Sequence, residues 1–199
     1  KPSTSTTAQT LFYYGGDDLV NEGRIELQQF SGNNIILRYG NNAGNLNFIG
    51  VGNFPTNAWN HVLITYSGAD TLTAAGGASA FKMYINGANG ISQVQATGGG
   101  YSGTIVADKF RIGRLDGSTT NQYLLDGIVN QIALFETDEN ANVAAIYNGG
   151  ATQDLSGLTS APVHYYEIED SETTVTDITG SANLAGFNFT ASDLVTDTP

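Results

Sequence analysis

The sequence predicts an all-β protein, an antiparallel sandwich of two sheets with one short helix. Short runs rich in β-branched and aromatic residues recur along the 199-residue chain, separated by glycine and asparagine. Several runs alternate, so that Phe81, Met83 and Ile85 share one face of a strand. Hydrophobic residues make up 40% of the chain, which is enough to fill a core between two sheets.

Each run is taken as one strand, bounded by its turn residues. Strands are predicted over residues 11–14, 24–30, 35–39, 46–51, 61–66, 81–86, 91–95, 104–106, 109–113 and 128–135. Three further strand-like runs follow at residues 163–168, 174–178 and 184–190. The glycine-rich stretches 74–80 and 98–103 are predicted to be hairpin tips or loops.

One helix is predicted near residues 137–149. Thr137 or Asp138 can cap its N-terminus, and Val143 and Ile146 recur at helical spacing. Gly149 stands where a left-handed residue ends a helix. We expect this helix to close one end of the sandwich rather than to carry chemistry.

The charge balance excludes several classes of partner. Seven basic residues stand against 19 acidic ones, which gives a formal net charge of −12. Such a chain lacks the basic surface of a nucleic-acid-binding protein, and an anionic membrane would repel it. The absence of cysteine excludes disulfides, thiol chemistry and cysteine-bound metals.

Five motifs follow one another in the order of a known family. They are Trp59–Tyr66 (WNHVLITY), Met83–Gly87 (MYING), Phe110–Gly113 (FRIG), Leu125–Phe135 (LDGIVNQIALF) and Ile146–Gly149 (IYNG). Together they make the chain similar to laminin-G-like domains, which are jelly rolls of the concanavalin A type, over about residues 8–150. The resemblance implies an antiparallel jelly-roll sandwich.

The chain departs from that family in two places. Asn130 and Gln131 replace an acidic pair, so the resemblance assigns no metal or salt-bridge role there. The chain opens at Lys1, without an initiator methionine, at a point that corresponds to the end of the family's first core strand. We therefore expect that strand to be missing and the chain to be a processed product or a fragment.

The end of the chain resembles the family's opening segment. The similar stretches are residues 165–169, 174–180 and 183–184, and with the final run 190–199 they also resemble structural proteins of environmental bacteriophages. We therefore expect a jelly-roll domain over 1–150, a linker or crossover over 151–162 and a C-terminal strand segment over 163–199.

The C-terminal segment offers a strand for exchange. Phe187 and Phe189 alternate, and Val195 lies farther along. One expectation is that this segment completes the sheet of a neighbouring copy, and the alternative is that it folds back on its own domain.

Four loop residues match the ligand rim that the family resemblance implies. They are Tyr101, Asp116, Asn121 and Tyr123. Tyrosine rings with amide and carboxylate acceptors are suited to binding glycans, whereas the alternative is that they are plain surface residues. Asn188 begins the sequence's N-glycosylation sequon.

Other candidate chemistry is weaker. The acidic run Glu167–Glu172 resembles a strand of β-glucanases, but Glu169 replaces its central aspartate, and Trp59 is the chain's one tryptophan. The run 98–103 spells G-x-G-x-x-G without the βαβ context of a dinucleotide site. His61 and His164 both lie in strand patterns and are interpreted as structural.

No cofactor is expected, with calcium as the open alternative. Calcium prefers several loop oxygens, and the acidic loop residues are Asp17, Asp18, Asp116, Asp126 and Asp138. Their spacing is not that of an EF-hand loop, so solvated turns are the competing interpretation.

Two classes of function follow. The first is a non-enzymatic structural protein, extracellular or on a virion surface, that assembles with copies of itself into a fibre or array by strand donation. The alternative is a glycan-binding adhesion module whose partners are surface glycans. A glycoside hydrolase ranks third, and neither nucleic acid nor membrane insertion is expected.

Overall fold

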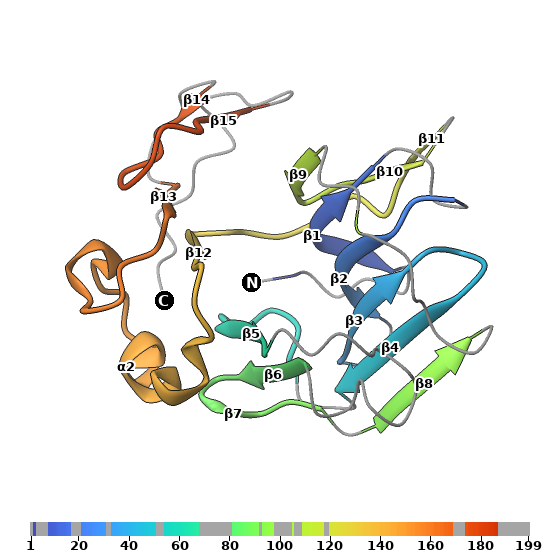
Figure 1. Cartoon of the computed structure of the whole chain (residues 1–199), viewed down its shortest axis with the longest axis horizontal. Helices are drawn as coiled ribbons and strands as arrows, with labels where there is room; N and C mark the ends of the chain where they lie inside the picture. Colours follow the sequence, from blue (N-terminus) through green and yellow to red (C-terminus); the bar gives the residue numbers. More distant parts are fainter. Residues whose placement is uncertain are drawn as a thin grey trace. The chain divides into compact units, whose positions relative to one another are not determined.

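The computed structural model (Figure 1) describes most of the chain in two compact units, Lys1–Gly127 (unit 1) and Ile128–Pro199 (unit 2). The described residues are 2, 8–16, 21–30, 33–50, 54–67, 81–91, 93–97, 105, 109–117, 120–168 and 174–186. The domain boundary expected near residue 150 lies inside unit 2. It does so because strand β12 (Gln131–Leu134) pairs with strand β13 (His164–Glu167).

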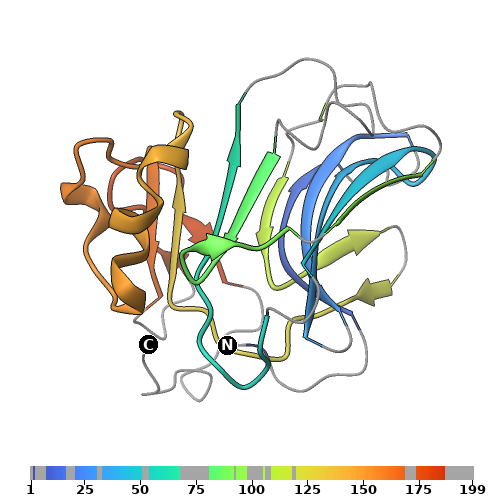
Figure 2. The same cartoon turned by 90° about the horizontal axis from the view of Figure 1, so that it is seen from below.

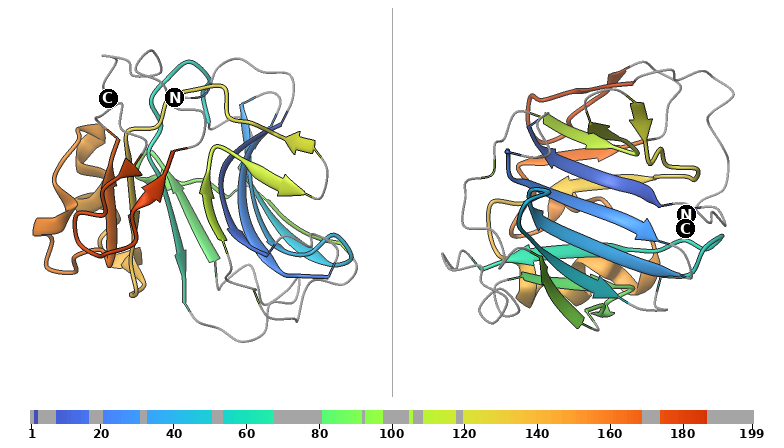
Figure 3. Two further views of the ribbon diagram at one scale, coloured as in Figure 1. Left: turned by 90° about the horizontal axis from the view of Figure 1, so that it is seen from above. Right: turned by 90° about the vertical axis from the view of Figure 1, so that its right-hand side faces the viewer.

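Unit 1 is built on a six-stranded antiparallel sheet. Its strands, in the order β8-β4-β3-β2-β1-β9, are β8 (Gln93–Thr97), β4 (Asn45–Gly50), β3 (Asn34–Gly40), β2 (Arg24–Phe30), β1 (Gln9–Gly15) and β9 (Lys109–Ile112). The right-hand view of Figure 3 shows β1 to β4 side by side. Because β1 to β4 are sequential neighbours, most of the sheet forms from local hairpins.

A second sheet covers one face of the first. It consists of β5 (Val62–Tyr66), β6 (Phe81–Ile85) and β7 (Ala88–Asn89). The alternation predicted for β6 is confirmed, since Phe81, Met83 and Ile85 are 1%, 0% and 4% exposed. They pack in one cluster with Leu37 and Phe48 of the six-stranded sheet, and Figure 2 shows β5 and β6 facing that sheet. The predicted jelly-roll sandwich is therefore confirmed.

A short hairpin follows the six-stranded sheet where loops were predicted. It pairs β10 (Leu115–Gly117) with β11 (Thr120–Gln122). After the hairpin, Tyr123 accepts a hydrogen bond at its carbonyl from the Thr10 N–H (2.8 Å), which ties the returning chain to β1. Strands of three residues are too short to show an alternating pattern, which is why the sequence did not predict them.

Unit 2 combines two short strand pairs with one short α-helix. The helix α2 (Val143–Tyr147) buries Val143 and Ile146, as predicted, and follows the 3₁₀ turn η1 (Glu139–Ala141), which Asp138 caps. The elements after α2 are η2 (Asn148–Gly150), η3 (Leu155–Gly157), β13, β14 (Thr174–Val175) and β15 (Leu184–Ala185). Asn148 (φ 47°) and Gly149 (φ 64°) are left-handed, which stops the helix.

Several predicted segments lie outside the described residues. They are the glycine-rich stretches 74–80 and 98–103, residues 104 and 106 of the run at 104–106, and the end of the run at 184–190. Ile105 is described and makes an isolated bridge with Gly23. In the part of the chain that the structure describes, no helix is long and apolar enough to span a membrane.

Candidate functional site

One row of polar side chains crosses all six strands of the large sheet. The row lies on the face turned away from β5, β6 and β7, which is the concave face of this curved sheet in Figure 2. The strand register places its members directly opposite one another, about 4.8 Å apart. From β9 to β8 they are Arg111, Tyr13, Glu26, Arg38, Asn47 and Gln95, which we call the polar row.

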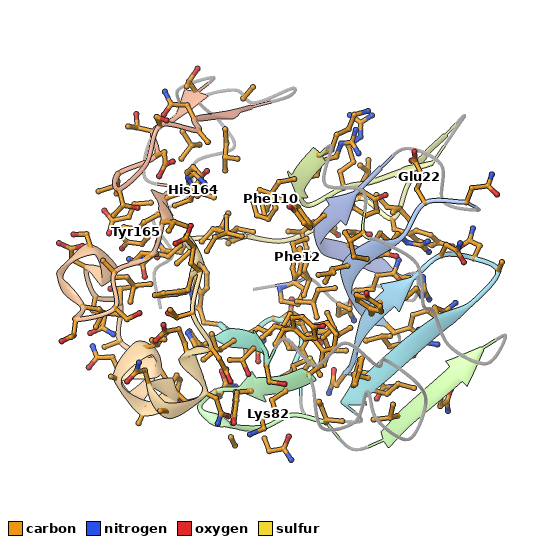
Figure 4. All side chains as sticks on the ribbon, in the orientation of Figure 1. Phe12, Glu22, Lys82, Phe110, His164 and Tyr165 are labelled. Atoms are coloured by element: carbon orange, nitrogen blue, oxygen red, sulfur yellow. The ribbon has the colours of Figure 1, made fainter. Side chains whose placement is uncertain are left out.

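The opposite side of the same strands is apolar, which shows how strand alternation separates the two faces. Phe12 and Phe110, labelled in Figure 4, point to the core side, and their ring centroids are 6.3 Å apart. Leu27 and Leu37 lie on that side as well and are buried. The polar side chains on the concave face are therefore not part of the hydrophobic core.

Glu26 is the centre of the polar row. Its Oε2 accepts hydrogen bonds from Arg24 Nε (3.1 Å) and Arg38 Nη1 (3.2 Å). Its Oε1 accepts one from Gln28 Nε2 (2.5 Å) and lies 3.5 Å from Thr10 Oγ1. The Glu26 side chain is fully buried, so these donors replace the water that a carboxylate needs.

The row has a closed half and an open half. Tyr13 and Glu26 are 1% and 0% exposed. Arg38 is 25% exposed at its side chain, and farther along the row Asn47 is half-buried and Gln95 is exposed. Arg38 is thus the point where a buried ion network reaches the surface.

Arg38 is held from both sides of the row. Its Nε donates to Asn47 Oδ1 (3.2 Å), while Nη1 donates to Glu26. Half-buried Ile36 and Ile49 flank Arg38 and Asn47 on the same concave face, two residues along each strand. The open half therefore combines fixed polar groups with a strip of apolar surface, which is the composition of many ligand sites.

An unsatisfied acceptor lies beside the row. Asn45, two residues before Asn47 on the same face, is 7% exposed. Its Nδ2 donates to the Asn41 carbonyl (3.1 Å), but its Oδ1 has no hydrogen-bond partner among the described residues. A buried acceptor of this kind calls for a donor such as a water or a ligand hydroxyl.

The sequence alone did not reveal the polar row. The alternation of Arg24, Glu26 and Gln28 along β2 is visible in it and places three polar groups on one face. Their alignment with Arg38 and Asn47 depends on the register between strands, which a single sequence does not give.

The glycan-binding residues predicted from the sequence gather in part on the β10–β11 hairpin. Asp116 and Asn121 are directly opposite each other across it. Tyr123 follows at once in a left-handed conformation (φ 61°), with 41% of its surface exposed beside exposed Leu124. Tyr101 lies outside the described residues, as do the strand-donor residues Phe187, Phe189 and Val195 and the sequon at Asn188.

In unit 2 the most connected polar group is Asp177, whose side chain is fully buried. Its two oxygens accept hydrogen bonds from the backbone N–H groups of Tyr165 (3.1 Å), Gly180 (3.0 Å) and Ala182 (3.0 Å), and His164 Nδ1 lies 2.6 Å away. Burial alone raises the pKa of this carboxyl, but the His164 and backbone hydrogen bonds outweigh it and hold the pKa far below its usual value.

The contacts around Asp177 also explain why residue 180 is a glycine. A Cβ on Gly180 would come within 2.6 Å of His164 Nδ1 and would overlap Asp177 Oδ2. Both His164 and Tyr165, labelled in Figure 4, are therefore fixed on β13 by a loop that closes around one carboxylate. The interpretation of His164 as structural agrees with these contacts. His61 is half-buried, and burial lowers its pKa.

Glu167, the described member of the glucanase-like run, is engaged in a local network. Its Oε1 accepts hydrogen bonds from Tyr165 Oη (2.5 Å) and Gln131 Nε2 (3.2 Å). Burial and then the contact with Glu167 raise the pKa of Tyr165 well above its usual value. Glu169, Asp170 and Glu172 lie outside the described residues.

The acidic residues considered for calcium are scattered where they are described. Asp138 caps η1 by accepting from the Asn140 N–H (3.1 Å), and Asp126 is exposed. Asp17 and Asp18 lie outside the described part of the chain. Among the residues that the structure does describe, no three His, Cys, Asp or Glu side chains gather as metal ligands.

Comparison with known proteins gives one family match. A laminin-G family model, described as the concanavalin A-like lectin/glucanases superfamily, matches residues 1–153. No curated protein and no solved structure matches the chain.

Proposed function

Because the chain belongs to the concanavalin A-like lectin/glucanase superfamily, we propose that it is a glycan-binding module that holds a sugar chain on the concave face of its six-stranded sheet. The observation that carries this proposal is the open half of the polar row. Arg38, Asn47 and Gln95 present side chains in register on three adjacent strands. Sugars are bound by such fixed polar groups beside an apolar strip.

The chemistry of the row favours binding over hydrolysis. A glycoside hydrolase of the common type needs two carboxyl groups about 5–10 Å apart, one of them able to donate a proton. Glu26 is the one carboxylate that the described strands of this sheet place on the concave face, and two arginines hold it. We therefore expect no release of reducing ends from β-glucans by the full chain.

The proposal is tested with a glycan array probed with the labelled full chain and its variants. Asn47→Ala and Gln95→Ala are expected to weaken binding about 2- to 10-fold each, because each removes one hydrogen-bonding side chain from the open half. Lys82→Ala, which changes an exposed residue of β6, is the matched control and is expected to bind normally. An array with no bound glycan contradicts the proposal.

The same experiment distinguishes a glycan site at the β10–β11 hairpin from one on the concave face. Tyr123→Ala removes the exposed ring of the residue that directly follows the β10–β11 hairpin. If Tyr123→Ala abolishes binding while Asn47→Ala and Gln95→Ala leave it intact, the glycan binds at the β10–β11 hairpin and the assignment to the concave face is wrong.

Self-assembly by strand donation is the second candidate, and one observation favours it. Among the described strands, β5 pairs with β6 alone and β12 pairs with β13 alone, so each unit has a strand with one edge unpaired within that unit. Unpaired edges of this kind accept an added strand. Residues 164–167 pair with β12 in the same chain, which favours a donor farther along the C-terminal segment.

Strand donation therefore rests on the residues beyond β15. Removing residues 187–199 leaves β12 to β15 intact and deletes the predicted donors Phe187, Phe189 and Val195. If this segment is the donor, the full chain forms fibres or larger particles in electron micrographs and the shortened chain does not. A shortened chain that assembles as the full chain does would exclude this segment as the donor.

A further inference from the structure

Three asparagines of the chain are followed directly by glycine, the pairing at which an asparagine side chain reacts most readily with its own backbone. The pairs are Asn86–Gly87, Asn89–Gly90 and Asn148–Gly149. In this reaction the glycine nitrogen attacks the side-chain carbonyl carbon of the asparagine, and glycine favours it because no Cβ blocks the approach. The three pairs share one chemistry, so their surroundings in the fold decide how readily each of them reacts.

Asn86 is held at both ends of its side-chain amide. It lies in the tight turn between β6 and β7, and its Oδ1 accepts a hydrogen bond from the His61 N–H (2.9 Å). Its Nδ2 donates to Asn60 Oδ1 (3.3 Å). The side chain must leave both contacts before its carbonyl carbon can meet the Gly87 nitrogen, so the native fold protects this pair.

Asn89 is protected mainly through its glycine. The Gly90 nitrogen, which would have to attack, already donates its proton to the Met83 carbonyl (2.7 Å), and Gly90 is buried. The Asn89 side chain is itself exposed, but its Oδ1 accepts a hydrogen bond from the Ile91 N–H (3.1 Å). Reaction at this pair therefore requires local opening of the chain beside β6.

Asn148 lies in the exposed turn that follows α2 (Figure 1). Its side chain makes one long hydrogen bond, from Nδ2 to the Ala151 carbonyl (3.3 Å), and Oδ1 makes none within the described part of the chain. Gly149 is exposed too, and a Cβ built on it would meet no side chain within 4 Å apart from those of its immediate neighbours. The reacting atoms can therefore meet without the opening of a strand.

We propose that Asn148 is a site of spontaneous deamidation in the folded chain. The Gly149 nitrogen forms a bond to Asn148 Cγ, the Cγ–Nδ2 bond breaks, and Nδ2 leaves as ammonia with the proton that the Gly149 nitrogen gives up. Water then opens the resulting succinimide ring at either carbonyl, which leaves aspartate or isoaspartate at this position. The reaction consumes one water, releases one ammonia and needs no enzyme, oxidant or reductant.

The product changes the turn after α2. A carboxylate has no N–H, so the hydrogen bond to the Ala151 carbonyl is lost. Isoaspartate also adds a methylene to the main chain at the left-handed residue (φ 47°) that ends the helix. The new negative charge lies in unit 2, whose sequence contains no lysine or arginine. We therefore expect faster hydrogen exchange over residues 143–153 in the modified chain.

Peptide mapping of the full chain by mass spectrometry tests the site. The chain is incubated at mildly alkaline pH, and the three peptides are followed for replacement of NH₂ by OH. In the folded chain Asn148 is expected to react about 10-fold faster than Asn86 or Asn89, because those two pairs must first break additional hydrogen bonds. In guanidinium chloride these contacts are lost, and the three pairs are expected to react at similar rates.

Two variants serve as controls. Asn148→Gly removes the reacting amide and keeps a residue that suits the left-handed conformation. The acidic species that ion-exchange chromatography separates from the aged wild type should be absent from this variant. Asn89→Ala removes an exposed asparagine of the same dipeptide and should leave that species in place.

Incubation continues until the denatured chain has reacted, so that each result is decisive. If Asn148 stays unmodified in the folded chain, or if Asn86 or Asn89 reacts there as fast, the proposal is wrong. The same ratio of rates in the folded and the denatured chain also contradicts it, because the fold then protects neither of the other pairs. Glycan binding on β3, β4 and β8 does not involve Asn148, so the proposed function stands or falls separately.

Discussion

Replacing Glu26 with alanine is expected to lower the free energy of unfolding of unit 1 by about 3–5 kcal/mol. The Arg24 side chain is 2% exposed and Arg38 25%, and both lose their ion pair with the Glu26 carboxylate. Gln28 and Thr10 lose their shared acceptor in the same change. Removing one member of a buried ion pair in this way costs far more than the net contribution of the intact pair.

Hydrogen exchange measured by mass spectrometry follows this effect in the full chain. Protection of the β2 and β3 amides should fall sharply in Glu26→Ala and less in Glu26→Gln, which keeps an acceptor oxygen. The triple variant Arg24→Met, Glu26→Leu and Arg38→Met removes all three charges together and should recover much of the stability. If Glu26→Ala is as protected as the wild type, the buried network is not the organising feature of the concave face.

Replacing Asp177 with alanine is expected to destabilise unit 2 by about 3 kcal/mol or more. Three backbone N–H groups, from Tyr165, Gly180 and Ala182, lose their acceptor, and each buried donor left without a partner costs about 1–3 kcal/mol. The loop that follows β14 is then no longer tied to β13.

The effect should be local. Exchange should rise in peptides covering residues 164–182 and stay unchanged in β1 to β4, because the lost bonds all lie within unit 2. Glu136→Ala, which removes an exposed carboxylate from the same unit, is the matched control. Wild-type exchange rates over 164–182 in Asp177→Ala would show that this carboxylate does not hold the loop.

The same carboxylate makes the stability of unit 2 depend on pH, in a direction that follows from its pKa. The Asp177 pKa is held far below that of an unfolded aspartate, which is about 3.9. The contribution of Asp177 to the stability of unit 2 is therefore complete above about pH 4. It is lost as the pH falls below that value toward the pKa of Asp177 in the folded state. Protection of residues 164–182 should accordingly decline in strong acid in the wild type, and this decline should be absent in Asp177→Ala.

Features with a short period in the sequence were predictable. The alternation of Phe81, Met83 and Ile85 was visible as a pattern and identified the buried face of β6. The predicted helix was found because Val143 and Ile146 share one side, although it extends over five residues of α-helix flanked by 3₁₀ turns. Local steric and hydrophobic preferences determine both features.

Features that depend on distant pairing were not predictable. The polar row joins residues from 13 to 111, and its alignment is fixed by five strand registers. The pairing of β12 with β13 places residues 164–167 against 131–134, so this part of the expected donor segment folds within its own chain. Asp177 could not be singled out among 19 acidic residues, because its partners are mainly backbone groups.

The central claim is that a glycan binds on the open half of the polar row, and nuclear magnetic resonance tests it most directly. The ¹⁵N-labelled full chain is titrated with the oligosaccharide that the array identifies as the tightest ligand, and amide shift changes are mapped onto the sequence. The account predicts that the largest changes fall on β3, β4 and β8, around Arg38, Asn47 and Gln95. Changes concentrated on the β10–β11 hairpin with Tyr123, or in unit 2, would contradict it.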